Sequence, residues 1–480
     1  MNTHAFRTRL AAPALMVLGL LTTPVLAAAP AKAAPAKAAP AREAPPAAAA
    51  PKPFKLPERT EFKLDNGLEV SLVPYGDVPK VALQLVLDTG NIHEKQNEVW
   101  LADLTSKLLL EGTTTRSAQQ LAQEAAKLGG PLSETTSTDQ TFLAIEVLSE
   151  SGPKAVSLLA DVIQNPRFPK EDLERVKGDL LRDLAIFKSQ PQVLADEQLF
   201  RAIYGDQHPY GRYFPTEEML KGYTQETVRA HFDANYGAAR ARLYVVGRYD
   251  AAQLEKAVRD AFSGWKAGPA RVENVPTQQV AKSVQLIDRP GAVQSTLRVA
   301  VKALPPSHPD YVKQEVLNTM LGGYFSSRIT ANIREKRGYS YSPNSAITTH
   351  VKDAYWVQRA DVTTAVTGES LKEILKEVDS LRKTAPSAQE LKDVQNYLAG
   401  FFLLQNSSRS GIINQLRFVD LHGLPDTYLR DYVQNVMAVT PEQVRQLAST
   451  ALKQDAMTVV IAGDQKVVKP QLKVLPPPLR

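Results

Sequence analysis

The order of strand-like and helix-like segments repeats once along the chain, and this limits the possible fold more than any other feature. An alternating apolar stretch at 81–88 precedes a helical stretch at 97–113, and 295–304 likewise precedes 310–321. The closing segments also correspond, 243–250 beside 459–464. The sequence therefore predicts an α+β protein of two homologous halves, each an antiparallel or mixed sheet with helices packed on one face.

The N-terminal residues are typical of an exported protein. Arg7 and Arg9 precede an apolar run and a small-residue cleavage pattern, so residues 1–28 are expected to be a signal peptide, and no cysteine follows for a lipid anchor. An Ala/Pro-rich linker is expected at 29–54. These features predict a periplasmic or otherwise exported protein without a membrane anchor after cleavage.

The rest of the chain divides at changes of composition. We expect an N-terminal domain at 55–263, an interdomain linker at 264–283, a C-terminal domain at 284–470 and a Pro-rich tail at 471–480. The formal net charge of +6 is concentrated in residues 1–53, which carry +5, so the remainder is nearly neutral and a nucleic-acid partner is not indicated. The absence of cysteine excludes disulfides and thiolate metal sites.

The stretch 97–113 carries the most informative pattern of the first half. Trp100, Leu104 and Leu108 recur at helical spacing, and Gly112 is placed to end the helix. The stretch resembles the first active-site helix of the insulinase/pitrilysin peptidases, or inverzincins, in which His-x-x-Glu-His precedes apolar residues and Gly-Thr. The resemblance implies the fold of the mitochondrial processing peptidases and, in catalytic members, a zinc ion.

The residues at the metal-binding positions of that family are replaced here. Asp103 and Lys107 stand where the family has its two imidazoles, Ser106 replaces the general base, and Asp183 stands at the third-ligand position. An ammonium group repels a cation, so no metal is expected on this chain. Two interpretations are open: Lys107 lies between Asp103 and Asp183 in place of the metal, or these three are solvated surface charges.

The second half contains a stretch, 321–341, that resembles the C-terminal signature of the same family. The resemblance implies that Arg334 and Tyr341 act as the pair that reaches the zinc site in catalytic members, where both are donors to a developing negative charge. The alternative is that Arg334 pairs with a nearby Glu and Tyr341 is an ordinary strand residue.

In some bacterial members of the family a subunit with replaced metal positions and a retained Arg/Tyr pair joins a catalytic one, so the resemblance implies a non-catalytic subunit of a heteromeric periplasmic zinc peptidase. The partner would carry His-x-x-Glu-His and the zinc, and the two chains would enclose a peptide substrate. A peptide-binding or scaffold protein without proteolysis is the second hypothesis. The third is an autonomous peptidase using Asp103 and Asp183 with another metal. The strand expected at 140–148 is a candidate edge strand for a peptide, and His208 is expected to be a structural loop residue.

Overall fold

The computed structural model describes residues 57–271, 283–351 and 353–475, all within one compact unit. The expected signal peptide (1–28), the Ala/Pro-rich linker (29–54), part of the interdomain linker and the last five residues lie outside the described residues. The signal peptide and the linker therefore stay predictions.

The first half is built on a six-stranded sheet with strand order β1-β2-β6-β3-β5-β4. Neighbours pair antiparallel except β2 and β6, which are parallel. The central strand β3 is buried over nearly its whole length because both faces of the sheet are covered. The strands are β1 (Thr60–Lys63), β2 (Glu69–Pro74), β3 (Lys80–Leu87), β4 (Ser133–Thr136), β5 (Thr141–Leu148) and β6 (Ala241–Gly247).

The second half repeats this topology in a five-stranded sheet with order β7-β11-β8-β10-β9. The pair β7 and β11 is parallel, as β2 and β6 are, and the other pairs are antiparallel. The strands are β7 (Ser283–Asp288), β8 (Gln294–Lys302), β9 (Asn344–His350), β10 (Asp353–Thr363) and β11 (Thr458–Gly463). The predicted pair of homologous α+β halves is confirmed.

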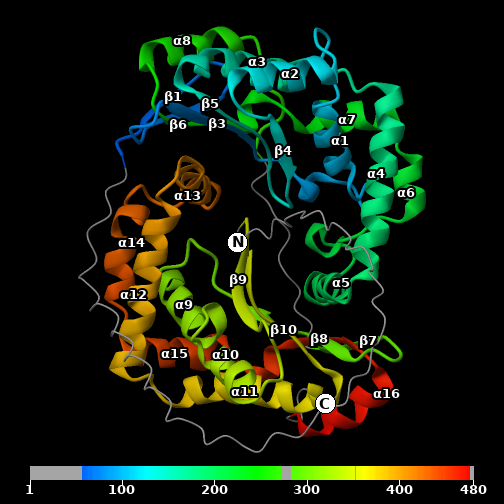
Figure 1. Ribbon diagram of the computed structural model, residues 1–480, viewed down its shortest axis with the longest axis vertical. Coiled ribbons are helices and arrows are strands. Elements are labelled where there is room, and N and C mark those ends of the chain that lie inside the picture. Colours follow the sequence, from blue (N-terminus) through cyan, green and yellow to red (C-terminus); the bar gives the residue numbers. More distant parts are fainter. Residues whose placement is uncertain (1–56, 272–282, 352, 476–480) are drawn as a thin grey trace, which may run out of the picture. The chain divides into compact units, whose positions relative to one another are not determined.

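Helices cover one face of each sheet with an apolar core between the layers, as Figure 1 shows for α2, α3 and α8 on the first sheet. The helices of the first half are α1 (Leu101–Leu109), α2 (Ala118–Leu128), α3 (Gly152–Gln164), α4 (Lys170–Ser189), α5 (Pro191–Tyr204), α6 (Glu217–Gly222), α7 (Gln225–Asn235) and α8 (Ala251–Phe262). Those of the second half are α9 (Tyr311–Asn318), α10 (Arg328–Thr330), α11 (Thr367–Lys383), α12 (Ala388–Gln405), α13 (Arg409–Leu421), α14 (Thr427–Met437), α15 (Pro441–Ala451) and α16 (Gln465–Val468).

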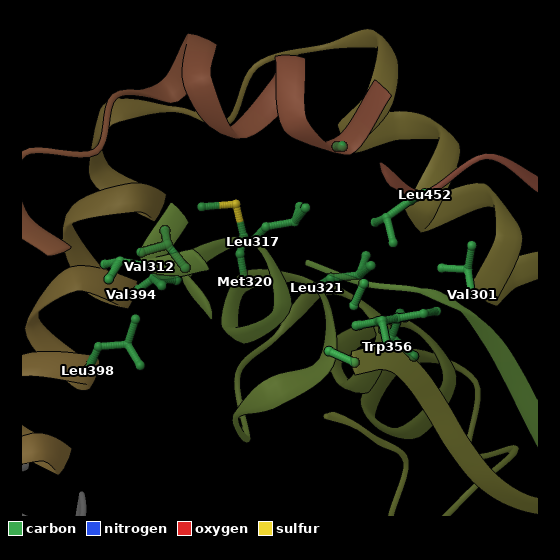
Figure 2. Close-up of a cluster of buried hydrophobic side chains, with 14 of the residues drawn as sticks. Val301, Val312, Leu317, Met320, Leu321, Trp356, Val394, Leu398 and Leu452 are labelled. Atoms are coloured by element: carbon green, nitrogen blue, oxygen red, sulfur yellow. The ribbon is translucent and has the colours of Figure 1, made fainter. Parts of the chain in front are cut away.

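The apolar core of the second half joins residues that are distant in sequence. Figure 2 shows side chains from β8, α9, β10 and α12 gathering in it, among them Val301, Leu317, Trp356 and Leu398. Trp356 is anchored there because its indole N–H donates to Asn318 Oδ1 at 3.0 Å. This packing holds the segment after α9 against the sheet, and that segment leads to the Arg334 region.

The opposite face of each sheet is covered by a helix from the other half. Helix α5 packs on β8 and β11 through Leu199 and Ile203, and α13 packs on β3 and β6. Arg298 of β8, a buried guanidinium, bonds Asp196 of α5 at 2.6 Å. The halves are therefore joined by apolar contacts and an ion pair as well as by the chain itself.

Three details differ from the expected arrangement. The edge strand beside 140–148 is β4, which is short and polar, so the expected edge strand β5 lies inside the sheet between β3 and β4. Trp265, within the expected linker, is buried in the first core, and Leu475, within the expected tail, is buried in the second.

No helix among the described residues is both long and apolar enough to cross a membrane.

Candidate functional site

Helix α1 carries three of the four positions that the sequence marked as a former zinc site. Its N-terminus is held by Glu94, whose Oε1 accepts a hydrogen bond from the Ala102 N–H at 2.8 Å. Trp100, just before the helix, adopts a left-handed conformation with φ 66°, and its indole N–H donates to the Tyr213 carbonyl. The start of the helix is therefore fixed by a buried carboxyl and an anchored ring.

Asp103 belongs to a pair of acids that share one amide donor. Asn91 Nδ2 donates to Asp103 Oδ2 at 2.6 Å and to Glu94 Oε1 at 3.1 Å. Burial raises the pKa of Asp103 to about 6, although Asn91 and Lys107 act in the opposite direction. Burial, with the adjacent Asp103, raises the pKa of Glu94 to about 8. Near neutral pH the pair thus holds one proton, on Glu94.

Ser106 and Lys107 are engaged by Glu134 of β4, a residue that the sequence analysis did not single out. Ser106 Oγ donates to Glu134 Oε2 at 2.8 Å, and the Thr136 hydroxyl donates to Ser106. Lys107 Nζ lies 3.8 Å from Glu134 Oε1. Within the described residues no ion pair joins Lys107 to Asp103 or Asp183, so its ammonium does not bridge those two carboxylates.

Asp183 lies on α4, a helix that packs against α1, and is partly buried. In the described part of the chain, no hydrogen bond or ion pair connects it to the other three positions.

The residues at these four positions do not fit a zinc ion. The carboxylate of Asp103 is bonded to Asn91, the hydroxyl of Ser106 to Glu134, and the ammonium of Lys107 is a cation. Among the described residues no group of three or more His, Asp or Glu side chains is arranged to hold a metal. A hydrogen-bonded network occupies the place that the family gives to metal ligands, so no catalytic step through a metal on this chain follows.

Arg334 and Tyr341 lie together on the second half. The Arg334 guanidinium is 4.5 Å from the Phe325 ring centroid and 5.1 Å from that of Tyr341. Arg334 also pairs with the adjacent Glu335 at 3.1 Å, as the alternative interpretation of this residue required. Tyr341 is nevertheless 83% exposed and lies outside any regular strand, and Phe325 is 62% exposed.

The backbone that carries Arg334 is held by contacts with the core and with α11. A π-helical segment, Ala331–Lys336, is anchored by the buried Ile333. Asn332 donates to Glu373 of α11 at 2.9 Å and accepts from Arg337 at 3.0 Å. A partly buried arginine on an anchored segment thus contacts an exposed phenol ring, which favours a directional role for the pair.

His208 helps to hold the conformation of its own loop. His208 is buried, and its Nδ1 accepts a hydrogen bond from the Tyr210 N–H at 3.1 Å.

Comparison with known proteins agrees with this geometry. Residues 74–213 match the model of the insulinase family (peptidase family M16), and residues 222–398 match that of the peptidase M16 inactive domain. An uncharacterised zinc protease of Rickettsia felis is 29% identical over 60% of this chain and 69% of its own length. The uncharacterised zinc protease YmxG of Bacillus subtilis is 24% identical over 84% of this chain and 97% of its own length.

Among solved structures, a peptidase M16 inactive domain from Pseudomonas fluorescens superposes with a TM-score of 0.79. It is 26% identical to this protein, and the match covers 84% of this chain and 98% of that chain. The two matched models together span both halves of the fold, and the retained and replaced motifs lie within them. The chain belongs to the insulinase family of peptidases, family M16.

Proposed function

We propose that this protein is the non-catalytic subunit of a two-chain zinc peptidase and supplies Arg334 and Tyr341 to the active site of a partner. The partner would be a family member that carries His-x-x-Glu-His and binds the zinc. Together the two chains would enclose the peptide substrate.

The observation that carries this proposal is the contrast between the two halves. In the first half, Ser106 and Lys107 contact Glu134, and the Asp103 carboxylate accepts a hydrogen bond from Asn91. In the second half, Tyr341 is 83% exposed above a guanidinium that is held by a rigid segment. The favourable contact between the guanidinium and the phenol ring keeps Arg334 and Tyr341 beside each other at the surface.

The chemistry of the pair suits peptide hydrolysis at a neighbouring metal. Attack on a peptide carbonyl places negative charge on its oxygen, and donors that are already oriented stabilise that charge. A guanidinium supplies fixed N–H donors, and a phenol supplies one O–H. Without a metal of its own, this chain is expected to be inert when isolated.

The sequence of the N-terminus supports a periplasmic setting for this assembly, since a signal peptide is expected at 1–28. A partner of the same family would have to be exported with it.

A second candidate function is peptide binding or scaffolding without proteolysis. It is favoured by a cavity beside Asp103 that is lined by aromatic rings and does not depend on Arg334 or Tyr341.

Mixing the purified chain with a zinc-bearing companion distinguishes the two. The proposal predicts that the mixture cleaves peptides that neither chain cleaves alone, and that size-exclusion chromatography shows a complex. A companion that is fully active by itself, or a complex that stays silent with both chains folded, would favour the scaffold.

A further inference from the structure

A cavity of about 270 Å³ lies beside the Asp103 end of α1. Six aromatic rings line it, those of Trp100, Phe187, Phe200, Tyr210, Tyr213 and Phe214. They support one another, since the Trp100 ring meets Phe214 edge-on at 5.9 Å and Phe200 stacks on Tyr213 at 5.2 Å. The cavity is smaller than the roughly 300–1,000 Å³ typical of sites for whole small molecules, so its size suits one large side chain.

The same cavity is lined by His350, at the end of β9, which is 6% exposed. Its Nδ1 lies 3.3 Å from Asp139 Oδ2, and its ring stacks on Tyr210 at 4.2 Å. Tyr210 in turn donates its phenol hydrogen to Asp139 at 2.7 Å. In the tautomer that directs its Nδ1 hydrogen at the carboxylate, Nε2 is an acceptor.

This Nε2 is buried and has no hydrogen-bond partner among the described residues. A buried polar atom without a partner is unfavourable and uncommon in folded proteins. The Asp103 carboxyl also lines the cavity, which adds a second acceptor, and the Arg212 guanidinium lies there as well. The polar part of the cavity therefore offers two acceptors, His350 Nε2 and the Asp103 carboxylate, to a hydrogen-bond donor of the ligand.

We propose that this cavity binds the side chain of a tyrosine or tryptophan of a peptide. The six rings enclose the aromatic body, and His350 Nε2 accepts a hydrogen bond from the phenol O–H or the indole N–H. A phenylalanine or leucine side chain fills the space but leaves Nε2 unpaired. The inference rests on the proposed function only in taking a peptide as the ligand.

Peptide titrations of the isolated full chain, followed by ligand-observed NMR, test this. The probes are N-acetyl-Ala-X-Ala-amides in which X is tyrosine, tryptophan, phenylalanine or alanine. We expect the tyrosine peptide to bind about fivefold to tenfold tighter than the phenylalanine peptide, the effect of one net hydrogen bond. The alanine peptide should bind more weakly than all three others.

Two variants locate the binding. Phe187→Ala removes one wall and should weaken the tyrosine peptide, whereas Ile186→Ala, the exposed neighbour on the same helix outside the cavity lining, should not. His350→Leu should bring the tyrosine-to-phenylalanine ratio close to one while phenylalanine binding persists.

Equal affinities for the tyrosine and phenylalanine peptides, equal effects of the two α4 variants, or no binding of any peptide would overturn the assignment. Because these titrations use the chain alone and measure no cleavage, their failure is distinct from the failure of the mixing experiment.

Discussion

Replacement of Glu94 by glutamine should change how stability depends on pH. Glu94 is buried and bonded to Asn91 and to the backbone of Ala102, and burial raises its pKa from 4.5 to about 8. The folded state therefore holds a proton that the unfolded state releases at pH values above 4.5. The stabilisation from this proton is complete below pH 4.5 and is lost as the pH rises towards 8.

The size of the effect follows from the pKa shift. In the middle of this window each pH unit costs about 1.4 kcal/mol of unfolding free energy for one proton. The cost per unit is smaller near either pKa, so between pH 5 and 8 the total is about 3 kcal/mol. Glutamine resembles the protonated glutamate in shape and does not titrate. The Glu94→Gln variant should thus match the parent near pH 5 and exceed it by about 3 kcal/mol at pH 8.

Urea unfolding followed by tryptophan fluorescence at several pH values measures this difference. Glu150→Gln, at an exposed glutamate, is the matched control and should track the parent at every pH. Parallel pH profiles for Glu94→Gln and the parent would show that Glu94 is ionised in the folded protein, and the account of the acid pair would be refuted.

Three further changes have defined outcomes. The combined variant Asp103→His, Ser106→Glu and Lys107→His restores the family motif. Calorimetry should show this variant binding about one equivalent of zinc while the parent binds none. If the variant also binds no zinc, the alignment of these positions with the family motif is wrong. Arg298→Ala removes a buried ion-pair partner between α5 and β8 and should cost about 3–5 kcal/mol in urea unfolding; a loss below about 1 kcal/mol would contradict the role of this pair in joining the halves. Arg334→Ala, at the surface, should change the unfolding free energy by less than about 1 kcal/mol, and a larger loss in the same assay would indicate a structural role.

Much of the fold was predictable because its signals are local. The alternating pattern at 81–88 indicated β3, and Asn66-Gly67, a typical hairpin turn, lies between β1 and β2. Ser117 and Ser387 precede helices as capping residues and do cap α2 and α12. Each of these features depends on a few consecutive residues.

The missing parts depend on contacts between distant residues. Strand β4 is Ser-Glu-Thr-Thr, which has no apolar alternation, so neither the edge strand nor Glu134 was visible in the sequence. Glu134 reaches Ser106 and Lys107 only because β4 lies next to α1. The only sequence signal for Glu134 was that an acidic residue stands in a polar stretch just before the clearly patterned strand β5.

The acid pair was missed for a related reason. Glu94 lies in a polar loop stretch of the sequence, which predicts exposure, yet the N-terminus of α1 and Asn91 enclose it. Burial of an acid is a tertiary effect that hydropathy does not reveal.

Steady-state kinetics of the mixed subunits test the role of Arg334 and Tyr341 most directly. Tyr341→Phe keeps the ring over the guanidinium but removes the phenol O–H, and Tyr397→Phe is a control at a partly exposed tyrosine of the same half. Arg334→Ala and Tyr341→Phe should each lower kcat of the mixture by about a hundredfold or more, with assembly unchanged and Tyr397→Phe fully active. Full activity of both variants in an assembled complex would contradict the proposal that this chain completes a partner's active site.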